Sequence, residues 1–549
     1  MTYKIIYKKN HQRFINIEFT CQIGNENEII CQLPIWRPGR YITGNFMKNL
    51  RNFHVYNENS EPLPYSKIEK EKWLIKTQNS KAVKICYEYY ADELNAGSSY
   101  IDENQLYINP VNCLIYIASK MNEKCDIIFD IPDNFKIACS LKQKTANTYE
   151  AQNFDELFDS PIITSNQLLR HSFETSLCQI NVWFNGLQNP DFIRLENDFR
   201  KFIEAHFQIF KTCPVNEFHF LFQILPFKFF HGVEHQKNTV IALGPENSVF
   251  NDRYNDFLGV SCHEFFHLWN VKSIRPIEML PYRFDKENFS ASGYVYEGIT
   301  TYYGDWILYQ CNLFSKEKMA EIFSQTIQKH LDNFGRFHNS LADSSLETWV
   351  DGYETFAPNR KVSIYNEGFL IALIIDAELR KISLQKLTLD KAMKVFYERF
   401  GELKKGYDHL SILNICTEIT GSDFTWIWYN LINKRVCYFE KVKESLPYIG
   451  FKCEQKSSEN YFEKNLGLKT MEINGKITVI GIYPNSPSFQ ANISIFDIIE
   501  NFEEINTLLS QNEAPNELLF QLNRNQFVRT VSVKHEINNY YQKAIVIEI

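Results

Sequence analysis

Two histidines and a glutamate at fixed spacing are the most chemically informative residues of this sequence. They are His263, Glu264 and His267, in the pattern H-E-x-x-H. On a helix, residues i and i+4 lie on one face, so both imidazoles can reach one tetrahedral metal ion. Glu264 lies one residue around from His263, near enough to contact a water at the metal without ligating the metal itself. The alternative is a helix with two surface histidines and an unrelated glutamate.

A third metal ligand has to come from elsewhere in the chain, and Glu297 is the candidate. It lies in the run from Tyr294 to Tyr303, which predicts the start of a second helix packed beside the first. Its neighbours are aromatic and apolar, and an unpaired buried carboxylate would be costly. Metal ligation would remove that cost. Two histidines and one glutamate predict an open, catalytic zinc site with ligands for one ion per chain.

The secondary structure that must position these residues is predicted to change along the chain from strands to helices and back to strands. Residues 1–185 contain short alternating segments broken by polar turn clusters, which predicts an N-terminal β-sandwich-like domain. Residues 186–444 predict a mainly helical domain, and short strands return in a small third domain, 445–549. The fold class is therefore multidomain α+β. The helix-like stretches are 191–211, 253–271, 294–311, 315–333, 365–382 and 388–400.

Composition and charge exclude several classes of protein. The 549 residues include 66 acidic and 58 basic side chains, far from the basic balance of a nucleic-acid binder. The densest apolar run, Phe369 to Ile375, is much shorter than the ~20 residues needed to span a bilayer. The charged N-terminus does not resemble a signal peptide, and the 13 cysteines include no C-x-x-C pair. We expect reduced thiols and a cytoplasmic protein, with a removed export signal as the alternative.

A longer run around the two histidines shows a family resemblance. Residues His263 to Pro276 resemble the signature of the glycyl aminopeptidase family, the PDZ-containing gluzincin metallopeptidases. The gap of 29 residues between His267 and Glu297 is also similar to that family, whereas the aminopeptidase N type has a shorter gap. Further matching runs occur in the expected order, at Leu33 to Tyr41, Asp155 to Pro161, Gly232 to His235 and Tyr365 to Gly368.

The resemblance implies a zinc-dependent aminopeptidase with a thermolysin-like catalytic domain and a preference for small first residues such as Gly or Ala. Glu264 would be the general base, and Tyr365 would donate to the oxyanion of the tetrahedral intermediate. Taken alone, Tyr365 would be a buried aromatic at the start of an apolar helix. Gly232, Val233 and Glu234 would form an edge strand that pairs with the peptide backbone. Glu234 would bind the free α-amine, although taken alone it could be an ordinary exposed side chain.

The C-terminal region resembles a PDZ domain in the run Asn465 to Leu468 and in residues 484–499. Asn465 and Asn492 stand where that pattern usually has glycine, and asparagine can still adopt a positive φ. The implied role is either peptide capture by strand addition or an intramolecular contact that packs against or gates the substrate site.

Two further functions fit the same features. One is a zinc endopeptidase with the same catalytic residues. The other is a non-catalytic scaffold that uses only the PDZ domain, and the presence of all three ligands and the base argues against it. The expected partners are peptides with a free N-terminus, and neither nucleic acid nor a membrane span is expected.

Overall fold

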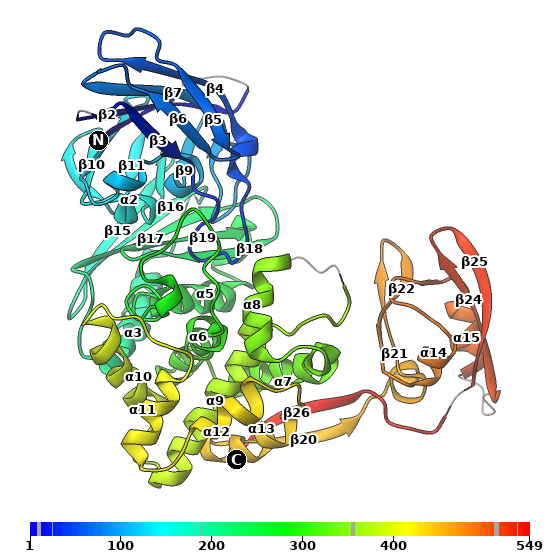
Figure 1. Cartoon of the computed structure of the whole chain (residues 1–549). Coiled ribbons are helices and arrows are strands. Elements are labelled where there is room, and N and C mark those ends of the chain that lie inside the picture. The colour runs from blue at the N-terminus through cyan, green and yellow to red at the C-terminus, as the bar shows by residue number, and fades with distance from the viewer. Residues whose placement is uncertain (8–11, 25, 188, 353–356, 510–514, 535) are drawn as a thin grey trace.

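The computed structural model describes residues 1–549 except 8–11, 25, 188, 353–356, 510–514 and 535. A β-rich N-terminal region, a mainly helical middle region and a small β unit follow one another along the chain (Figure 1). The predicted α+β class, β-rich N-terminal domain and helical domain are confirmed. None of the described helices is long and apolar enough to cross a membrane.

The N-terminal region is built on a seven-stranded sheet with the order β12-β13-β10-β1-β2-β7-β4. Alternate residues of its strands are buried, as β2 shows with Ile15, Ile17, Phe19 and Cys21 on the inner face. The strands are β1 (Thr2–Ile6), β2 (Phe14–Gln22), β4 (Leu50–Asn57), β7 (Ala82–Tyr90), β10 (Cys125–Asp130), β12 (Lys142–Thr145) and β13 (Thr148–Ala151).

Two smaller sheets complete this region, in the orders β3-β6-β5 and β11-β14-β9-β8. Their strands are β3 (Glu28–Gln32), β5 (Tyr65–Glu69), β6 (Lys72–Lys76), β8 (Tyr100–Ile101), β9 (Gln105–Ile108), β11 (Lys136–Ala138) and β14 (Ile162–Ser165). Two short helices, α1 (Pro110–Cys113) and α2 (Phe154–Phe158), lie between strands. Three sheets that share one continuous core fit the expected layered β architecture.

A mixed five-stranded sheet joins the β-rich region to the helical one. Its order is β15-β16-β17-β19-β18, with β16, β17 and β19 parallel and the two edge strands antiparallel. Because β16 ends at Asn185, the predicted domain boundary at 185 lies inside this sheet. The strands are β15 (Leu169–Glu174), β16 (Gln179–Asn185), β17 (Glu217–Ile224), β18 (Phe229–Glu234) and β19 (Asn238–Gly244).

Each of the six predicted helical stretches contains a helix. The helix in 253–271 ends at Phe266, earlier than predicted, because tight turns follow. The stretch 294–311 begins as a π-helical segment, η4 (Tyr294–Ile299), before α6. The helices are α3 (Phe192–Phe210), α4 (Glu246–Val249), α5 (Tyr254–Phe266), α6 (Thr300–Gln310), α7 (Lys316–Asp332), α8 (Leu341–Asp351), α9 (Ile364–Ser383), α10 (Leu389–Phe396), α11 (Ser411–Thr420), α12 (Thr425–Ile427) and α13 (Phe439–Ser445).

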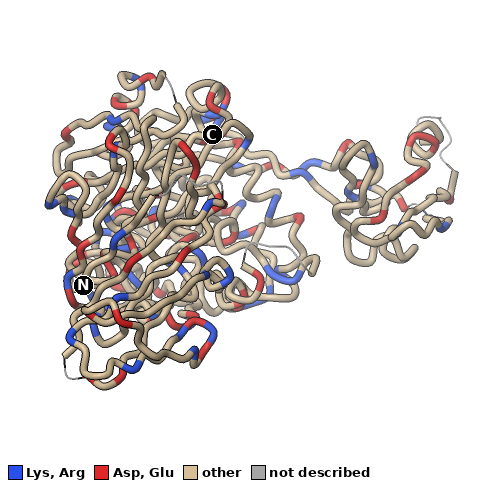
Figure 2. Tube along the Cα trace, turned by 90° about the horizontal axis from the view of Figure 1, so that it is seen from above, with Lys and Arg blue, Asp and Glu red and all other residues tan. Residues whose placement is uncertain are grey.

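The C-terminal unit has its own hydrophobic core and lies beside the main body (Figures 1 and 2), which it contacts through an ion pair from Lys469 to Asp332 at 2.6 Å. Acidic and basic residues are interspersed along the whole trace (Figure 2). Asn492 has a φ of 58°, whereas Asn465 lies in the helical turn η9 (Phe462–Leu466), and Gly467 after it has the positive φ. The sheet order is β21-β22-β23-β24-β25, from β21 (Leu468–Ile473), β22 (Lys476–Ile482), β23 (Ile498–Ile499), β24 (Glu517–Arg524) and β25 (Phe527–Lys534), with helices α14 (Pro487–Gln490) and α15 (Phe502–Leu509).

An antiparallel ribbon of β20 (Phe451–Ser457) and β26 (Gln542–Glu548) connects this unit to α7. The Gln328 side chain bonds the backbone of Gln542 and Ala544, and the backbone N–H of Val546 donates to Ser324 Oγ. The ribbon therefore packs with the helical region, although the sequence placed residues from 445 onward in the third domain.

Two glycines allow the π-helical segment η4 to cross the start of α9 at very short range. A Cβ added at Gly298 would lie 2.3 Å from the Cα of Gly368, and one added at Gly368 would lie 2.5 Å from the Cα of Gly298. Only glycine permits backbones to approach this closely. The crossing lies next to Glu297 on one segment and near Tyr365 on the other, so it fixes where these two residues lie.

We predict that Gly298→Ala lowers the midpoint of thermal unfolding, because the new methyl group would collide with backbone that cannot move aside. Overpacking of this kind costs about 1–3 kcal/mol. Gly259→Ala in α5 is the matched control, since its Cβ would have only an ordinary contact, 3.9 Å from Asp305 Oδ1. Alanine in a helix is more stable than glycine, so the control should be neutral or stabilising. Equal midpoints for the two variants would contradict the role of the crossing.

Candidate active site

Three of the predicted residues, His263, Glu264 and His267, lie at or just after the C-terminal end of α5. Cys262, Phe265 and Phe266 are fully buried in the core and anchor the other faces of the helix. His263 and Glu264 therefore face the edge of the five-stranded sheet and the segment η4, and His267 follows directly after the last helical residue.

His263, His267 and Glu297 come together in a compact group. The two Nε2 atoms are 3.1 Å apart, and Glu297 Oε2 is 3.5 Å from Nε2 of His267 and 3.8 Å from Nε2 of His263. One donor atom from each residue lies within 4.8 Å of the others. Two imidazole nitrogens and one carboxylate oxygen are the donor set of a catalytic zinc site, so these residues fit that ion.

Hydrogen bonds around the group fix the orientation of its side chains. Nδ1–H of His267 donates to the backbone oxygen of Asn270 at 2.7 Å, which leaves Nε2 as a free electron-pair donor. The Asn270 side chain in turn donates to Val295 O at 2.8 Å and to Thr300 Oγ1 at 3.0 Å. The end of α5 is thereby tied to both ends of the segment that carries Glu297.

The N-terminal region contributes Tyr41, a residue to which the sequence analysis gave no role. Its hydroxyl donates to Glu297 Oε1 at 2.9 Å, so Oε2 is the oxygen that faces the histidines. Burial, reinforced by the charge of Glu297, raises the pKa of Tyr41 well above its usual value, and the phenol is a donor at neutral pH. The sequence feature that could have pointed to Tyr41 is the turn at residues 36–41, which has an aromatic residue at each end.

Glu264 lies against the edge strand β18. A Cβ at Gly232 would lie 2.2 Å from Glu264 Oε1, so glycine at this position makes the room that the carboxylate occupies. Oε2 of Glu264 is buried and has no hydrogen-bond partner among the described residues. Burial raises the pKa of Glu264 well above its usual range. A buried acceptor without a partner is expected where a substrate or water is to be bound.

Glu234 ends β18 and lies beside the same group. Donor atoms of Glu234, Glu264 and His267 all lie within 4.8 Å of one another. The turn of the N-terminal region covers this carboxylate, because a Cβ at Gly39 would lie 2.5 Å from Glu234 Oε2. Gly39 has a φ of +80°, a conformation that glycine adopts without strain. Glu234 Oε1 is buried and has no partner among the described residues.

A buried ion pair fixes this strand to both regions. Asp159 Oδ1 accepts hydrogen bonds from Lys272 Nζ at 2.7 Å and from His235 Nδ1 at 3.1 Å, and Oδ2 accepts from the backbone N–H of Gln236 at 2.7 Å. Burial alone would raise the pKa of Asp159, but the charge of Lys272 and the bond from His235 hold it well below its usual value. The ionised Asp159 therefore joins the N-terminal region to the residues that flank Glu234.

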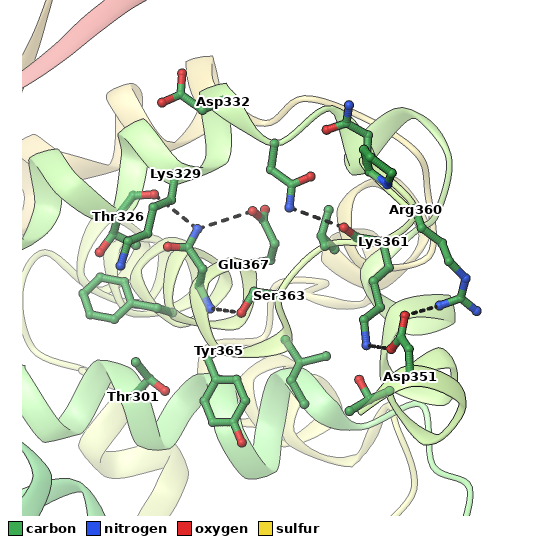
Figure 3. A pocket seen from close by; sticks show the side chains of 18 of the residues that line it. Thr301, Thr326, Lys329, Asp332, Asp351, Arg360, Lys361, Ser363, Tyr365 and Glu367 are labelled. Atoms are coloured by element: carbon green, nitrogen blue, oxygen red, sulfur yellow. Dashed lines mark hydrogen bonds and ion pairs between the residues drawn. The ribbon is translucent and has the colours of Figure 1, made fainter. Parts of the chain in front are cut away.

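Tyr365 lies in the first turn of α9, half-buried, and lines a cavity of about 1020 Å³. Thr301 lines the same cavity, and its hydroxyl donates to the backbone oxygen of Glu297 at 2.8 Å. In Figure 3 the Tyr365 ring points away from the charged residues of the cavity and toward a neighbouring helix. Tyr365 is also near enough to Tyr41 to contribute to its raised pKa.

The residue Val233 is fully buried in a separate core cluster, so only its backbone is available to a bound chain. Gly232 and Val233 lie in β18 at the edge of the sheet, as expected. The structure thus brings His263, His267, Glu297, Glu264, Glu234 and Gly232 to one place.

Comparisons with known proteins give a family from the sequence and a fold from the structure. A model of the peptidase M61 N-terminal domain matches residues 2–166, and one of the M61 glycyl aminopeptidase matches residues 256–371. A structure of an aminopeptidase N family protein from Idiomarina loihiensis is similar with a TM-score of 0.90 and 24% identity, covering 100% of this chain and 98% of that one.

A second similar structure is a mutant of an M1 zinc metallopeptidase from Deinococcus radiodurans bound to a Tyr-Ser-Ala substrate. Its TM-score is 0.50 at 11% identity, covering 79% of this chain and 93% of that one. No match was found among curated protein sequences.

We predict that Tyr41→Phe weakens zinc binding by about 10–100-fold, the usual effect of removing a hydrogen-bond partner of a metal ligand. The change removes one hydroxyl and keeps the ring, so the fold should persist. Tyr294→Phe is the matched control. It also removes a buried hydroxyl from the segment η4, but that hydroxyl donates to the backbone oxygen of His409 rather than to Glu297. Competition with a chelator of known affinity measures the constant. If both variants bind zinc as the wild type does, Tyr41 does not orient Glu297.

Proposed function

The chain belongs to the M61 glycyl aminopeptidase family and is a metallopeptidase, and from this premise we propose that His263, His267 and Glu297 hold one zinc ion at its catalytic centre. The observation that carries the proposal is the convergence of these three residues beside two buried carboxylates, Glu264 and Glu234, at a sheet edge. A structural zinc site would use four protein ligands and would not need the neighbouring acids.

When bound, zinc supplies a Lewis acid that polarises the scissile carbonyl and makes a water molecule acidic enough to be a nucleophile near neutral pH. Glu264 takes a proton from the attacking water and passes it to the leaving amine. Its position supports this role, because Gly232 leaves space for the carboxylate and Oε2 has no competing partner in the described part of the chain.

The hydroxyl of Tyr365 donates a hydrogen bond to the oxyanion that forms on the scissile carbonyl. The crossing at Gly298 and Gly368 supports this role, since it holds the first turn of α9 against the segment that carries Glu297. The cavity lined by Tyr365 and Thr301 then receives the part of the substrate beyond the scissile bond.

Glu234 binds the free α-ammonium group of the substrate. The backbone of Gly232 and Val233, at the outer edge of β18, pairs with the extended peptide, as edge strands do in other peptide-binding proteins. A carboxylate fixed beside the zinc ligands leaves room for one residue before the scissile bond. This arrangement favours an aminopeptidase over an endopeptidase with the same zinc site.

The substrates we propose are peptides with a free N-terminus and a small first residue, such as Gly or Ala, as the description of the family implies. Within the enzyme we propose an N-terminal β domain (1–185), a thermolysin-like catalytic domain (186–444) and a PDZ domain (445–549). Strands β15 and β16 extend the sheet of the catalytic domain, and the β20–β26 ribbon joins the PDZ domain to α7. The five-stranded sheet with two helices and the positive φ of Asn492 support the PDZ assignment.

The PDZ domain acts on the substrate cavity rather than as a separate peptide receptor. Its Ile480, Ile495 and Phe496 line the same cavity as Tyr365, and the exposed Phe496 and Ile480 side chains face it. Apolar side chains at this place would contact the distal part of a long peptide.

We predict that the purified protein contains about one zinc per chain and hydrolyses an aminoacyl chromogenic substrate. Glu264→Gln should keep the zinc and lower kcat by about 10²–10⁴-fold, because the base is lost while the ligands remain. Elemental analysis and steady-state kinetics on both proteins test this. Near-normal turnover by the variant would rule out Glu264 as the base.

We predict that Glu234→Gln lowers kcat/KM for free-amine substrates and leaves zinc occupancy unchanged. The charge-assisted bond to the α-ammonium is lost, whereas the shape of the side chain is kept. The measurement is the ratio of kcat/KM for Gly- and acetyl-Gly- versions of one reporter, in both proteins. An unchanged ratio would mean that another group anchors the amine, and substantial cleavage of the acetylated reporter by the wild type would favour the endopeptidase.

A further inference from the structure

Cys437, His330 and Glu367 form a second reactive cluster outside the zinc site. The sulfur of Cys437 is 3.5 Å from His330 Nε2, and His330 Nδ1 is 2.7 Å from Glu367 Oε2. The three residues come from the segment before α13, from α7 and from the first turn of α9. A thiol, a base and a carboxylate that orients the base are the arrangement that activates a nucleophile.

Two residues of the cluster are buried and held by several contacts, whereas the cysteine is exposed. His330 and Glu367 are completely or almost completely buried, whereas Cys437 is exposed. The Tyr438 hydroxyl also donates to Glu367 Oε2, and its ring stacks on His330 with centroids 4.4 Å apart. Arg336 Nη1 donates to the backbone oxygen of His330 at 2.8 Å. The imidazole is therefore held in place by contacts on its ring and its backbone, with Nε2 directed at the thiol.

Charge in the cluster favours a thiolate. Burial would lower the pKa of His330, but the carboxylate of Glu367 raises it to about 9, so the ring is protonated at neutral pH. Burial would raise the pKa of Cys437, but its bond to His330, the charge of His330, the backbone N–H of Phe439 and the charge of Arg336 together lower it. These are the groups that face the sulfur from the neighbouring elements.

We propose that Cys437 is a reactive thiol and a site of reversible mixed-disulfide formation with small-molecule disulfides. Its thiolate attacks one sulfur of the disulfide, and its electron pair forms the new S–S bond. The original S–S bond breaks, and its electron pair leaves with the departing thiolate, which takes a proton from water. The Cys437 sulfur rises from the thiol to the disulfide oxidation level while the departing sulfur falls from the disulfide to the thiol level, so no further oxidant is needed, and a free thiol reverses the reaction.

Other cysteines of the chain provide internal comparisons. Cys86 and Cys311 are half-buried rather than fully enclosed, so reagents can reach them to some extent. Burial raises the pKa of both, to about 11 for Cys311. They therefore report the reactivity expected from partial exposure without a hydrogen-bonded histidine among the described residues. The proposal is independent of the zinc site, since none of its ligands belongs to the cluster.

The test uses the reduced, zinc-loaded full-length protein, freed of reductant and exposed at pH 7 to 2-hydroxyethyl disulfide, which carries no charge. Peptide mass spectrometry follows the mixed disulfide at each cysteine. We expect Cys437 to react at least about tenfold faster than Cys86 and Cys311, because a larger fraction of it is thiolate. Cys437→Ser should remove the fast reaction. Equal rates at the three cysteines would overturn the proposal.

A second measurement separates activation by His330 from simple exposure. The rate of Cys437 alkylation by iodoacetamide, measured against pH in the wild type, should have its midpoint below the ordinary thiol value of about 8.5. His330→Gln, checked for folding by circular dichroism, should shift that midpoint upward. A wild-type midpoint at or above the ordinary value would overturn the proposal even if the variant fails to fold.

Discussion

The buried carboxylate of Glu297 is the point on which the rest of the site depends. One of its oxygens accepts a hydrogen bond from Tyr41 and the other faces His263 and His267, so each oxygen has a separate task. A carboxylate buried without partners would be protonated or excluded from the core. Helix α5, the segment η4 and the N-terminal turn must therefore meet at one place, and the Asn270 bonds and the glycine crossing keep them there.

Local sequence patterns are sufficient to predict those features of the site that depend on a single element. The spacing of His263 and His267 defines a common face, and the apolar surroundings of Glu297 make it a candidate to join them, as the structure places it. The helical stretches could also be predicted, because α3, α7 and α10 each bury one face at helical spacing and α9 contains a continuous apolar run. The π-helical start of 294–311 was missed, since five-residue hydrogen bonding leaves no periodic signal distinct from that of an α-helix.

Contacts between segments that are distant in the sequence could not be predicted from local sequence patterns. Tyr41 and Glu297 are 256 positions apart, and nothing in either local pattern specifies that one donates to the other. The same holds for Gly39 against Glu234 and for Lys272 against Asp159, pairs that form only when the two regions dock. Strand patterns likewise predict strands, but they do not predict that β16 pairs with β17.

These long-range contacts have a consequence for specificity under the proposed function. The helices supply the zinc ligands and the base, which any endopeptidase of this chemistry also needs. The N-terminal turn covers Glu234 through Gly39 and orients Glu297 through Tyr41, and the Asp159 ion pair holds that region against the flanks of β18. A peptide that continued past Glu234 would have to displace this turn. Restriction to the N-terminal residue therefore arises from the docking of the β-rich region, and the hydrolytic chemistry arises from the helical one.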